Sequence, residues 1–270
     1  MSNLHERCEI FHRLHESGCF VIPNPWNSGS ARLLAQLGFK ALATTSSGFA
    51  WSLGHVDGGV PLESVLGHLR EMSAAVSIPI SADFEGGFAR DPAGVSGNVA
   101  AAAATGIAGL SVEDSSGDPS DPLFEFSLAV ERIRAAREAI DASGHRLLLT
   151  ARSEGFIRGR PDLAETTRRL AAYREAGADC LFAPGLRSTS DIKAIVDAAA
   201  PTPVNVLMSS DFASVADLAG LGVRRISVGG ALARAAWTGF LQAATEIAEH
   251  GTFQGLARAI PGGDMNKLFL

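Results

Sequence analysis

The sequence predicts an α/β fold, a (β/α)8 TIM barrel in one domain over residues 1–270, and three observations support this. Eight short apolar runs recur along the chain, each followed by a longer alanine-rich stretch with helical spacing. Several runs, such as LLLTAR and ISVG, are apolar on successive residues, as parallel strands covered on both faces require. Eight strand–helix units favour a closed barrel over an open doubly wound sheet, which has about five to seven strands.

The expected strands and helices alternate from one end of the chain to the other. Glycines such as Gly38, Gly144 and Gly222 follow helical stretches as stop signals, so the turns into the next strands are short. Apolar runs place strands at 20–22, 39–44, 78–83, 108–113, 147–152, 179–183, 204–207 and 225–228. Helical spacing places helices near 27–37, 61–76, 96–105, 127–142, 162–176, 189–199, 212–220 and 231–249, with an N-terminal helix around 3–16.

Composition limits the kinds of function. The chain has 270 residues, 23 Lys and Arg against 29 Asp and Glu, a net charge of −6 and 46% hydrophobic residues. These values exclude collagen, disorder and a disulfide-stapled miniprotein, and they give no electrostatic footprint for nucleic acid or an anionic membrane. No apolar run reaches membrane-spanning length, and the opening segment carries charges instead of an apolar signal core. We therefore expect a cytoplasmic protein that acts on small molecules.

Polar residues gather where the expected strands end, which is where a barrel of this kind builds its active site. The second strand runs into TTSSGFAWSLGHVDGG, and the next three end in ADFEGGF, SVEDSSGD and TARSEGF. Their acids would repel one another at one mouth unless a hard cation or an arginine neutralised them. Ligands that offer only oxygen favour Mg²⁺ or Mn²⁺ over Zn²⁺, so a divalent metal is implied. The residues concerned are Asp57, Asp83, Glu85, Glu113, Asp114, Arg152 and Glu154.

Each of these acids also has an ordinary structural interpretation. Any one of them, taken alone, is equally well explained as a helix N-cap, a salt-bridge partner or a rim residue that promotes solubility. The paired glycines beside them, at 58–59 and 86–87, allow a ligand to approach the backbone, and turn chemistry selects glycine at such positions as well. Only the whole set at successive strand ends favours a metal site.

In these segments the chain resembles a known family, the isocitrate lyase and phosphoenolpyruvate mutase superfamily. The resemblance covers nearly the whole chain, through PNPWNSGSARLL, TTSSG, ADFEGGF, SVED, TARSEGF and RRISVGGALARAAWTGFLQA in this order. It implies a (β/α)8 barrel whose last helix is exchanged with a neighbouring subunit, in a homodimer or homotetramer. It also implies Mg²⁺ at the strand ends and chemistry through an enolate of pyruvate or a related 2-oxo acid.

The resemblance assigns roles around the metal. Asp83 resembles the direct ligand of the ion, and Glu85 and Glu113 resemble carboxylates that hold it through water. Asp57 resembles the loop acid near the metal. The family motif Asp-x-Asp-Thr-Gly-Tyr-Gly stands here as DFEGGFA, and Arg-Thr-Asp stands as RSE at 152–154. Two acids, Glu85 and Glu154, are thus one methylene longer, which bears on the position of the ion and its water shell.

The resemblance also assigns the substrate contacts. Hydroxyl and N–H groups of Ser46, Ser47 and Gly48 would hold a substrate carboxylate and keto oxygen. Arg152 would clamp the carboxylate, because a guanidinium offers a planar fork of donors. Asn205, in the seventh expected strand, completes the substrate-binding set. The expected catalytic residues are Arg152, Ser47, Glu113 and Asp57.

The segment after SVED narrows the reaction. Isocitrate and methylisocitrate lyases carry a Lys-Lys-Cys-Gly-His loop with a catalytic thiol, whereas this chain has SSGDPSDPLFEF, and the lysine and asparagine of the mutase gate are missing too. We therefore expect a Mg²⁺-dependent lyase that cleaves a C–C bond of a small 2-oxo or 2-hydroxy carboxylic acid, by decarboxylation or retro-aldol cleavage. Oxaloacetate is the simplest substrate candidate, with loop 115–122 closing over it. Two alternatives stay open: a mutase or hydrolase for the C–P bond of phosphonopyruvate, and a 2-oxo acid-binding protein with little turnover.

Overall fold

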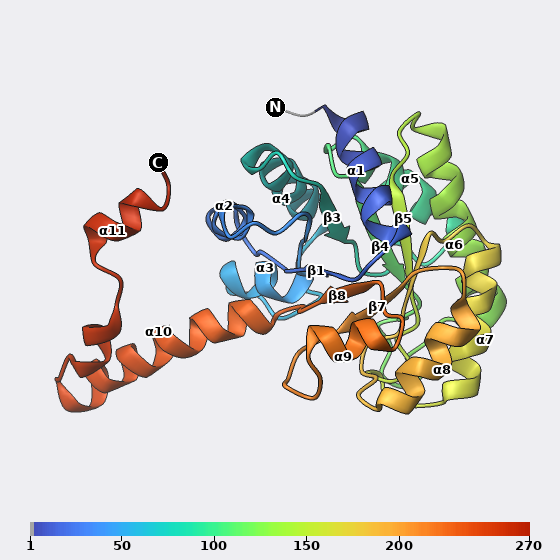
Figure 1. Ribbon diagram of the computed structural model, residues 1–270. Helices are drawn as coiled ribbons and strands as arrows, with labels where there is room; N and C mark the ends of the chain where they lie inside the picture. The colour runs from blue at the N-terminus through green and yellow to red at the C-terminus, as the bar shows by residue number, and fades with distance from the viewer. Residues whose placement is uncertain (1–2) are drawn as a thin grey trace.

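The computed structural model describes residues 3–270, and in this part of the chain eight parallel strands form a barrel (Figure 1). The strands follow the order β1-β8-β7-β6-β5-β4-β3-β2, with helices on the outside. The predicted (β/α)8 fold is confirmed, and only the second strand is much shorter than expected. The bounds are β1 Phe20–Ile22, β2 Leu42–Ala43, β3 Ile80–Asp83, β4 Gly109–Glu113, β5 Leu148–Arg152, β6 Cys180–Phe182, β7 Val204–Leu207 and β8 Arg225–Ser227.

Asn24 closes the barrel between β1 and β2, which share no ladder in the described chain. The N–H of Ala43 donates to the carbonyl of Pro23 at 3.1 Å, and the side-chain amide of Asn24 donates to the carbonyl of Thr44 at 3.0 Å. The Asn24 Oδ1 accepts the two successive N–H groups of 228–229 at 2.9 and 2.8 Å. One buried side chain therefore joins the ends of the first, second and eighth strands.

The expected helices are present, with two differences near the site, and two short helices follow α10 where none was expected. α5 begins at Pro92 instead of near 96, because Asp91 caps it and accepts the Gly94 N–H at 2.9 Å. The segment after β2, expected to be a loop, forms the short helix α3, which Thr45 caps. The bounds are α1 Leu4–Glu16, α2 Ser28–Gln36, α3 Ser46–Ser52, α4 Leu62–Ala75, α5 Pro92–Ala103, α6 Phe126–Ala142, α7 Leu163–Glu175, α8 Thr189–Ala199, α9 Val215–Gly220, α10 Ala231–His250, η1 Gln254–Arg258 and α11 Gly262–Lys267.

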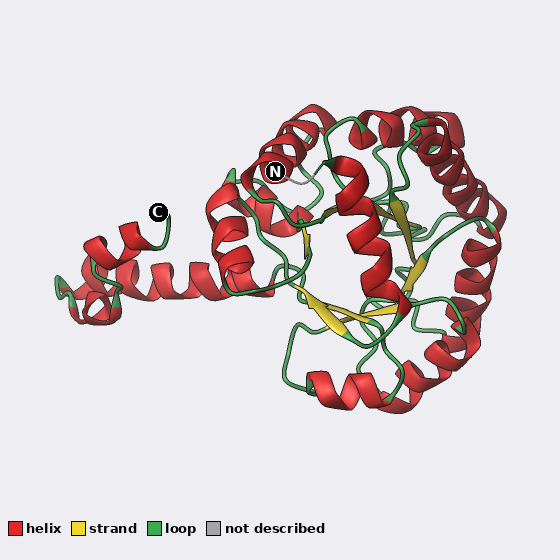
Figure 2. Cartoon of the chain, turned by 45° about the horizontal axis from the view of Figure 1, so that its top comes forward, coloured by secondary structure: helices red, strands yellow, loops and turns green. Residues whose placement is uncertain are grey.

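The helix α1 lies across the end of the barrel where the strands begin (Figure 2). Phe11 and His15 on its inner face are buried, and their ring centroids are 4.8 Å apart. A Cβ added to Gly109, the first residue of β4, would lie 2.8 Å from the Phe11 ring. The absence of a side chain at Gly109 thus lets α1 seat against the strand ends and close this side of the barrel.

The end of the chain, residues 231–270, forms a C-terminal arm that leaves the barrel along α10 (Figure 1). Large apolar side chains on the arm are exposed, including Phe240 at 59% and Phe253 at 63%. The last residues return toward α2, where Arg32 donates to the Phe269 carbonyl at 3.2 Å. None of the helices in residues 3–270 has the length and apolar character needed to cross a membrane. Exchange of this arm between subunits stays a prediction.

Replacing Gly109 by Ala should destabilise the protein, because the new methyl group would lie 2.7 Å from the Leu148 carbonyl oxygen and 2.8 Å from the Phe11 ring. Overpacking of a core costs about 1–3 kcal/mol, which urea unfolding measures. Gly97→Ala is the control: Gly97 is exposed within α5 with open space at its Cβ, so its free energy of unfolding should rise by about 0.5–1 kcal/mol. Unchanged stability of Gly109→Ala would contradict the close seating of α1.

His68 on α4 should make the protein sensitive to acid. Its ring stacks on Phe49 of α3 at 3.8 Å between centroids, its Nε2 is buried without a hydrogen-bond partner, and burial lowers the pKa of His68 to about 4. The unfolded chain takes up the proton near pH 6.5 and the folded chain only near 4, so stability falls as the pH drops through this window.

The variant His68→Phe keeps a stacked ring and cannot take up a proton. It should therefore gain about 2–3 kcal/mol over the wild type at pH 4, and differ little from it at pH 7.5. Urea unfolding at the two pH values measures both differences. An equal gain at both values would show that packing at this position, and not protonation, sets the difference.

Candidate active site

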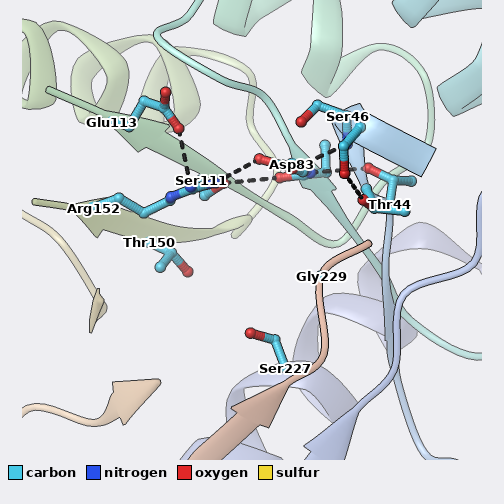
Figure 3. A network of polar contacts seen from close by, with 12 residues as sticks. Thr44, Ser46, Asp83, Ser111, Glu113, Thr150, Arg152, Ser227 and Gly229 are labelled. Atoms are coloured by element: carbon cyan, nitrogen blue, oxygen red, sulfur yellow. Dashed lines mark hydrogen bonds and ion pairs between the residues drawn. The ribbon is translucent and has the colours of Figure 1, made fainter. Parts of the chain in front are cut away.

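The register of the barrel brings the polar strand ends together. Asp83 at the end of β3 lies beside Ser111 of β4, and Glu113 at the end of β4 lies beside Arg152 at the end of β5. Figure 3 shows Asp83, Glu113 and Arg152 pointing toward one another, with Ser46 on the far side of Asp83. The carboxyl ends of three neighbouring strands therefore form one polar mouth.

Arg152 is the centre of this mouth. Its Nη1 lies 2.8 Å from Asp83 Oδ1, and its Nη2 lies 2.8 Å from Glu154 Oε1 and 3.2 Å from Glu113 Oε2. Burial alone would lower the pKa of Arg152, but the three carboxylates hold this pKa well above its usual value. Arg152 is thus a fixed cation, and it neutralises part of the acid cluster that the sequence predicts.

Ser46, the first residue of α3, connects the acids of the mouth to the loop that follows α3. Its N–H donates to Asp83 Oδ2 at 3.0 Å, and its hydroxyl donates to Asp57 Oδ1 at 3.2 Å. Thr44, which follows β2, also fixes Asp83, because its hydroxyl accepts the Asp83 N–H at 2.9 Å. Both oxygens of Asp83 are therefore held, one by Ser46 and one by Arg152.

Glu85 reaches the mouth from a turn of unusual backbone conformation. Its φ is +46°, in the left-handed region that residues with a Cβ rarely adopt, and Gly87 after it has φ +71°. Within the described chain the Glu85 carboxylate has no hydrogen bond or ion pair. Burial, together with repulsion from Asp83 and Asp57, raises the pKa of Glu85 to about 7. A carboxylate in this setting favours the arrival of a cation.

Two arginines that sequence reasoning missed complete the cluster. Arg158 lies 3.6 Å from Glu113 Oε1 and 3.4 Å from Glu154 Oε2, four residues after Glu154, a spacing that could have signalled the pair. Arg132 of α6 is buried and donates to the carbonyls of Glu113, Gly86 and, at 2.9 Å, Ala89. It ties the turn after β3 to the end of β4. The sequence around Arg132 does not distinguish it from a charged residue on the exposed face of a helix.

Two adjoining cavities open at the mouth and share Ser46, Asp57 and Arg152. The larger, of about 770 Å³, is lined by the segment 115–117 of the expected lid and by four of the acids, Asp57, Glu85, Glu113 and Glu154. The smaller, of about 210 Å³, runs into the barrel and is lined by polar groups of the strands, among them Asn205. Closure of loop 115–122 stays a prediction, as do the substrate contacts assigned to these residues.

The structure separates the predicted substrate-binding residues by position. Ser47 lines the smaller cavity, and its hydroxyl lies 3.1 Å from that of Thr45. Gly48 is buried and lines neither cavity; its N–H donates to the Thr45 hydroxyl, and a Cβ there would lie 3.0 Å from the Cβ of Trp26. Asn205 also lines the smaller cavity, and its side-chain amide donates to the Ser227 hydroxyl at 2.9 Å, which fixes its orientation.

Asp114 does not join the mouth, although its sequence position places it next to Glu113. Its Oδ2 accepts a hydrogen bond from Tyr173 at 2.6 Å and lies 3.2 Å from Arg169. Its Oδ1 accepts the N–H of Glu154 at 2.8 Å. Asp114 therefore connects β4 to α7, behind the mouth, and it is not among the four or five carboxylates expected to converge there.

The donor chemistry of the mouth fits a hard divalent cation. Arg152 and Arg158 provide every ion pair that these acids make in the described chain, and they leave Asp57 and Glu85 without a cationic partner. No three His, Cys, Asp or Glu of residues 3–270 stand close enough to hold an ion by themselves. Mg²⁺ commonly binds through one or two carboxylates and keeps several waters, so it suits such a site better than Zn²⁺.

Known proteins have similar sequences and a similar fold. A family model described as phosphoenolpyruvate phosphomutase matches residues 11–248. A structure from Burkholderia cenocepacia J2315, provisionally assigned as a lyase or mutase, has 46% identity and a TM-score of 0.95, covering 98% of this chain and 96% of that one.

Two further relatives have curated sequences. An uncharacterised protein of Mycobacterium tuberculosis strain H37Rv is 34% identical over 221 residues, 81% of each chain. The 2-methylisocitrate lyase of Escherichia coli K12 is 29% identical over 180 residues, 64% of this chain and 60% of that enzyme. The chain therefore belongs to the phosphoenolpyruvate phosphomutase family, within the isocitrate lyase and phosphoenolpyruvate mutase superfamily of carbon–carbon lyases and mutases.

Proposed function

We propose that the protein is a Mg²⁺-dependent lyase that cleaves a C–C bond of a small 2-oxo or 2-hydroxy carboxylic acid, by decarboxylation or retro-aldol cleavage. The observation that carries the proposal is the meeting of Arg152, Asp83 and Ser46 at the opening of the 210 Å³ cavity. This arrangement offers a fixed cation, an oxygen ligand and two hydrogen-bond donors within one small space. A carboxylate with a neighbouring keto or hydroxyl oxygen matches these groups.

Each residue of the mouth has a part in this reaction. Arg152 would bind the substrate carboxylate with its planar fork, exchanging one of its present carboxylate partners for that of the substrate. Ser46 and Ser47 would donate to the oxygen beside it, and Asp57 would orient Ser46 through their hydrogen bond. Mg²⁺, when bound among Asp83, Glu85 and Glu113, would supply a Lewis acid that stabilises the enolate left when the C–C bond breaks.

The enolate must be protonated to complete the reaction, and no cysteine is placed to donate this proton. None of the three cysteines lines either cavity of the described chain, and Cys8 and Cys180 are buried elsewhere. A hydroxyl, a carboxyl group or water must therefore deliver the proton. This favours oxaloacetate, whose decarboxylation needs no dedicated acid in the bond-breaking step, over isocitrate or methylisocitrate.

A second candidate is a mutase or hydrolase for the C–P bond of phosphonopyruvate. The match to a family model described as phosphoenolpyruvate phosphomutase favours it. Incubation with phosphonopyruvate followed by phosphorus NMR separates the two, since C–P cleavage or transfer moves the phosphorus signal and C–C cleavage of oxaloacetate releases no phosphate. A protein that binds these acids in calorimetry and converts none would instead be a 2-oxo acid-binding protein.

Removing the metal should abolish turnover. With oxaloacetate as the first substrate, pyruvate formation above the protein-free Mg²⁺ background should stop in EDTA and return with Mg²⁺ or Mn²⁺. Asp83→Ala should lower kcat/KM by about a hundredfold or more, because the acid that binds the ion and orients Arg152 is lost. A coupled assay of pyruvate measures both effects.

The control variant is Asp211→Ala, an exposed aspartate outside the mouth, which should keep wild-type kcat/KM. Calorimetric titration with Mg²⁺ supplies a readout independent of turnover. Activity in EDTA equal to that in Mg²⁺, or an Asp83→Ala variant with normal ion uptake and rate, would overturn the proposed mechanism.

The C-terminal arm should hold the protein in a homodimer or homotetramer. Exposed apolar side chains such as Phe240 and Phe253 lie on a segment that leaves its own barrel, so a second copy is the occupant that would cover them. Light scattering after gel filtration should give an oligomer, and Phe240→Asp with Phe253→Asp should shift it toward monomer. Leu37→Asp, on a residue 75% exposed at the end of α2, is the control and should leave the mass unchanged. A monomeric wild type would contradict the prediction.

A further inference from the structure

Arg225 is a charged side chain buried inside the barrel without an acidic partner. It is the first residue of β8, only 5% exposed, and none of the ion pairs in the described chain includes it. Its Nε donates to Asn205 Oδ1 at 2.9 Å, and its Nη2 donates to the Thr150 hydroxyl at 3.0 Å. Its Nη1 lies 3.3 Å from His15 Nε2. The other buried guanidinium groups have a carboxylate within reach, as Arg169 does, or donate to several backbone carbonyls, as Arg132 does.

The groups that contact Arg225 are neutral, and so is the nearby Cys180 thiol, whose pKa burial raises, so the protein does not compensate the charge of Arg225. The Nδ1 of His15 lies 2.8 Å from the Phe11 carbonyl, which makes Nδ1 the donor and leaves Nε2 as an acceptor for Arg225. Burial and the charge of Arg225 lower the pKa of His15 to about 3, so the imidazole is uncharged near neutral pH. Asn205 and Thr150 carry no charge at any pH. Burying a cation among neutral groups is costly unless an anion joins it.

Arg225 lines the 210 Å³ cavity, whose other end is the mouth. The cavity wall carries polar side chains on four strands, among apolar residues such as Ile22 and Leu207; the polar ones are Ser81, Ser111, Asn205 and Ser227. The interior of a (β/α)8 barrel is ordinarily filled by bulky branched side chains, so an open space with a buried cation is a departure from the rule. Its volume corresponds to roughly seven water molecules, which is enough for a small dicarboxylate.

Arg152 and Arg225 reach this cavity from successive levels of the barrel. Arg225 contacts Thr150, and Arg152 follows Thr150 by two residues on β5, which is a rise of about 6.6 Å along the strand. Side chains two residues apart on a strand point to the same face, here the interior. Of the five N–H groups of the Arg225 guanidinium, the three contacts above use three, and two remain for a ligand.

We propose that Arg225 binds the second carboxylate of a dicarboxylate substrate inside the barrel, below the carboxylate that Arg152 holds at the mouth. The inference rests on the proposed function for the position of the first carboxylate and adds the substrate class. Arg225 would then select dicarboxylic over monocarboxylic acids, because a ligand without the second carboxylate leaves the buried cation unpaired. Asn205 would act through Arg225 by orienting its guanidinium.

The test compares unreactive ligands of equal length, so it needs no turnover. Calorimetric titrations of the full chain with succinate and with butyrate are run in HEPES buffer free of chloride and of carboxylates, with and without Mg²⁺. The wild type should bind succinate about tenfold or more tightly than butyrate. Arg225→Met should lose this preference, and Arg225→Lys, which keeps a charge, should retain part of it. The matched control is Arg224→Met, at the neighbouring half-buried arginine that donates to the Gly18 carbonyl at 2.6 Å, and it should bind as the wild type does.

The outcomes separate this inference from the proposed function. Equal binding of succinate and butyrate by the wild type would overturn it, even if Arg225→Met failed to fold. A preference that survives in Arg225→Met would overturn it as well. Chloride that raises the melting temperature as much as succinate and competes with it would show a halide site instead. A succinate preference lost in Arg225→Met, in a protein that turns over none of the 2-oxo acids, would keep the inference and overturn the lyase function.

Discussion

The mouth of the barrel depends on one guanidinium held among three carboxylates. Arg152 lies within 3.2 Å of an oxygen of Asp83, Glu113 and Glu154, which come from the ends of three successive strands. Removing a charge from such a buried set leaves its partners uncompensated, which costs about 3–5 kcal/mol. The acids can stand this close only because Arg152 lies between them, and the loops that follow these strands take their positions from the same contacts.

The barrel itself could be predicted because each strand is a short apolar run and each helix has its own periodicity. α3 could not, because TTSSG has the composition of a turn, and it is the cap at Thr45 that starts the helix. α5 began earlier than expected for a reason visible in the sequence, the pair Asp91-Pro92, since Asp is a good N-cap and Pro a good first residue. Hydrophobic spacing finds the middle of an element more readily than its ends.

For the site, position at a strand end predicted which residues meet, but the expectation left out alternation along the strand, which explains why Asp114 does not join them. Glu113 and Asp114 are adjacent, so their side chains leave β4 on opposite faces, and only Glu113 enters the mouth. The same alternation separates Arg224, which turns outward, from Arg225, which turns into the barrel. The sequence could not predict the contacts of Arg132 or those of Arg225. The partners of each arginine lie on other elements, and nothing in the neighbouring sequence marks either arginine as buried.

The helix α1, with Phe11 and His15 buried on its inner face, covers the end of the barrel opposite the mouth. A ligand that enters the 210 Å³ cavity from the mouth would therefore also leave through the mouth. If a dicarboxylate is cleaved while its second carboxylate lies at Arg225, as proposed, the fragment at Arg225 stays in the cavity until the fragment at the mouth has left. The shape of the cavity, and not the relative affinity of the two fragments, would then set the order in which they are released.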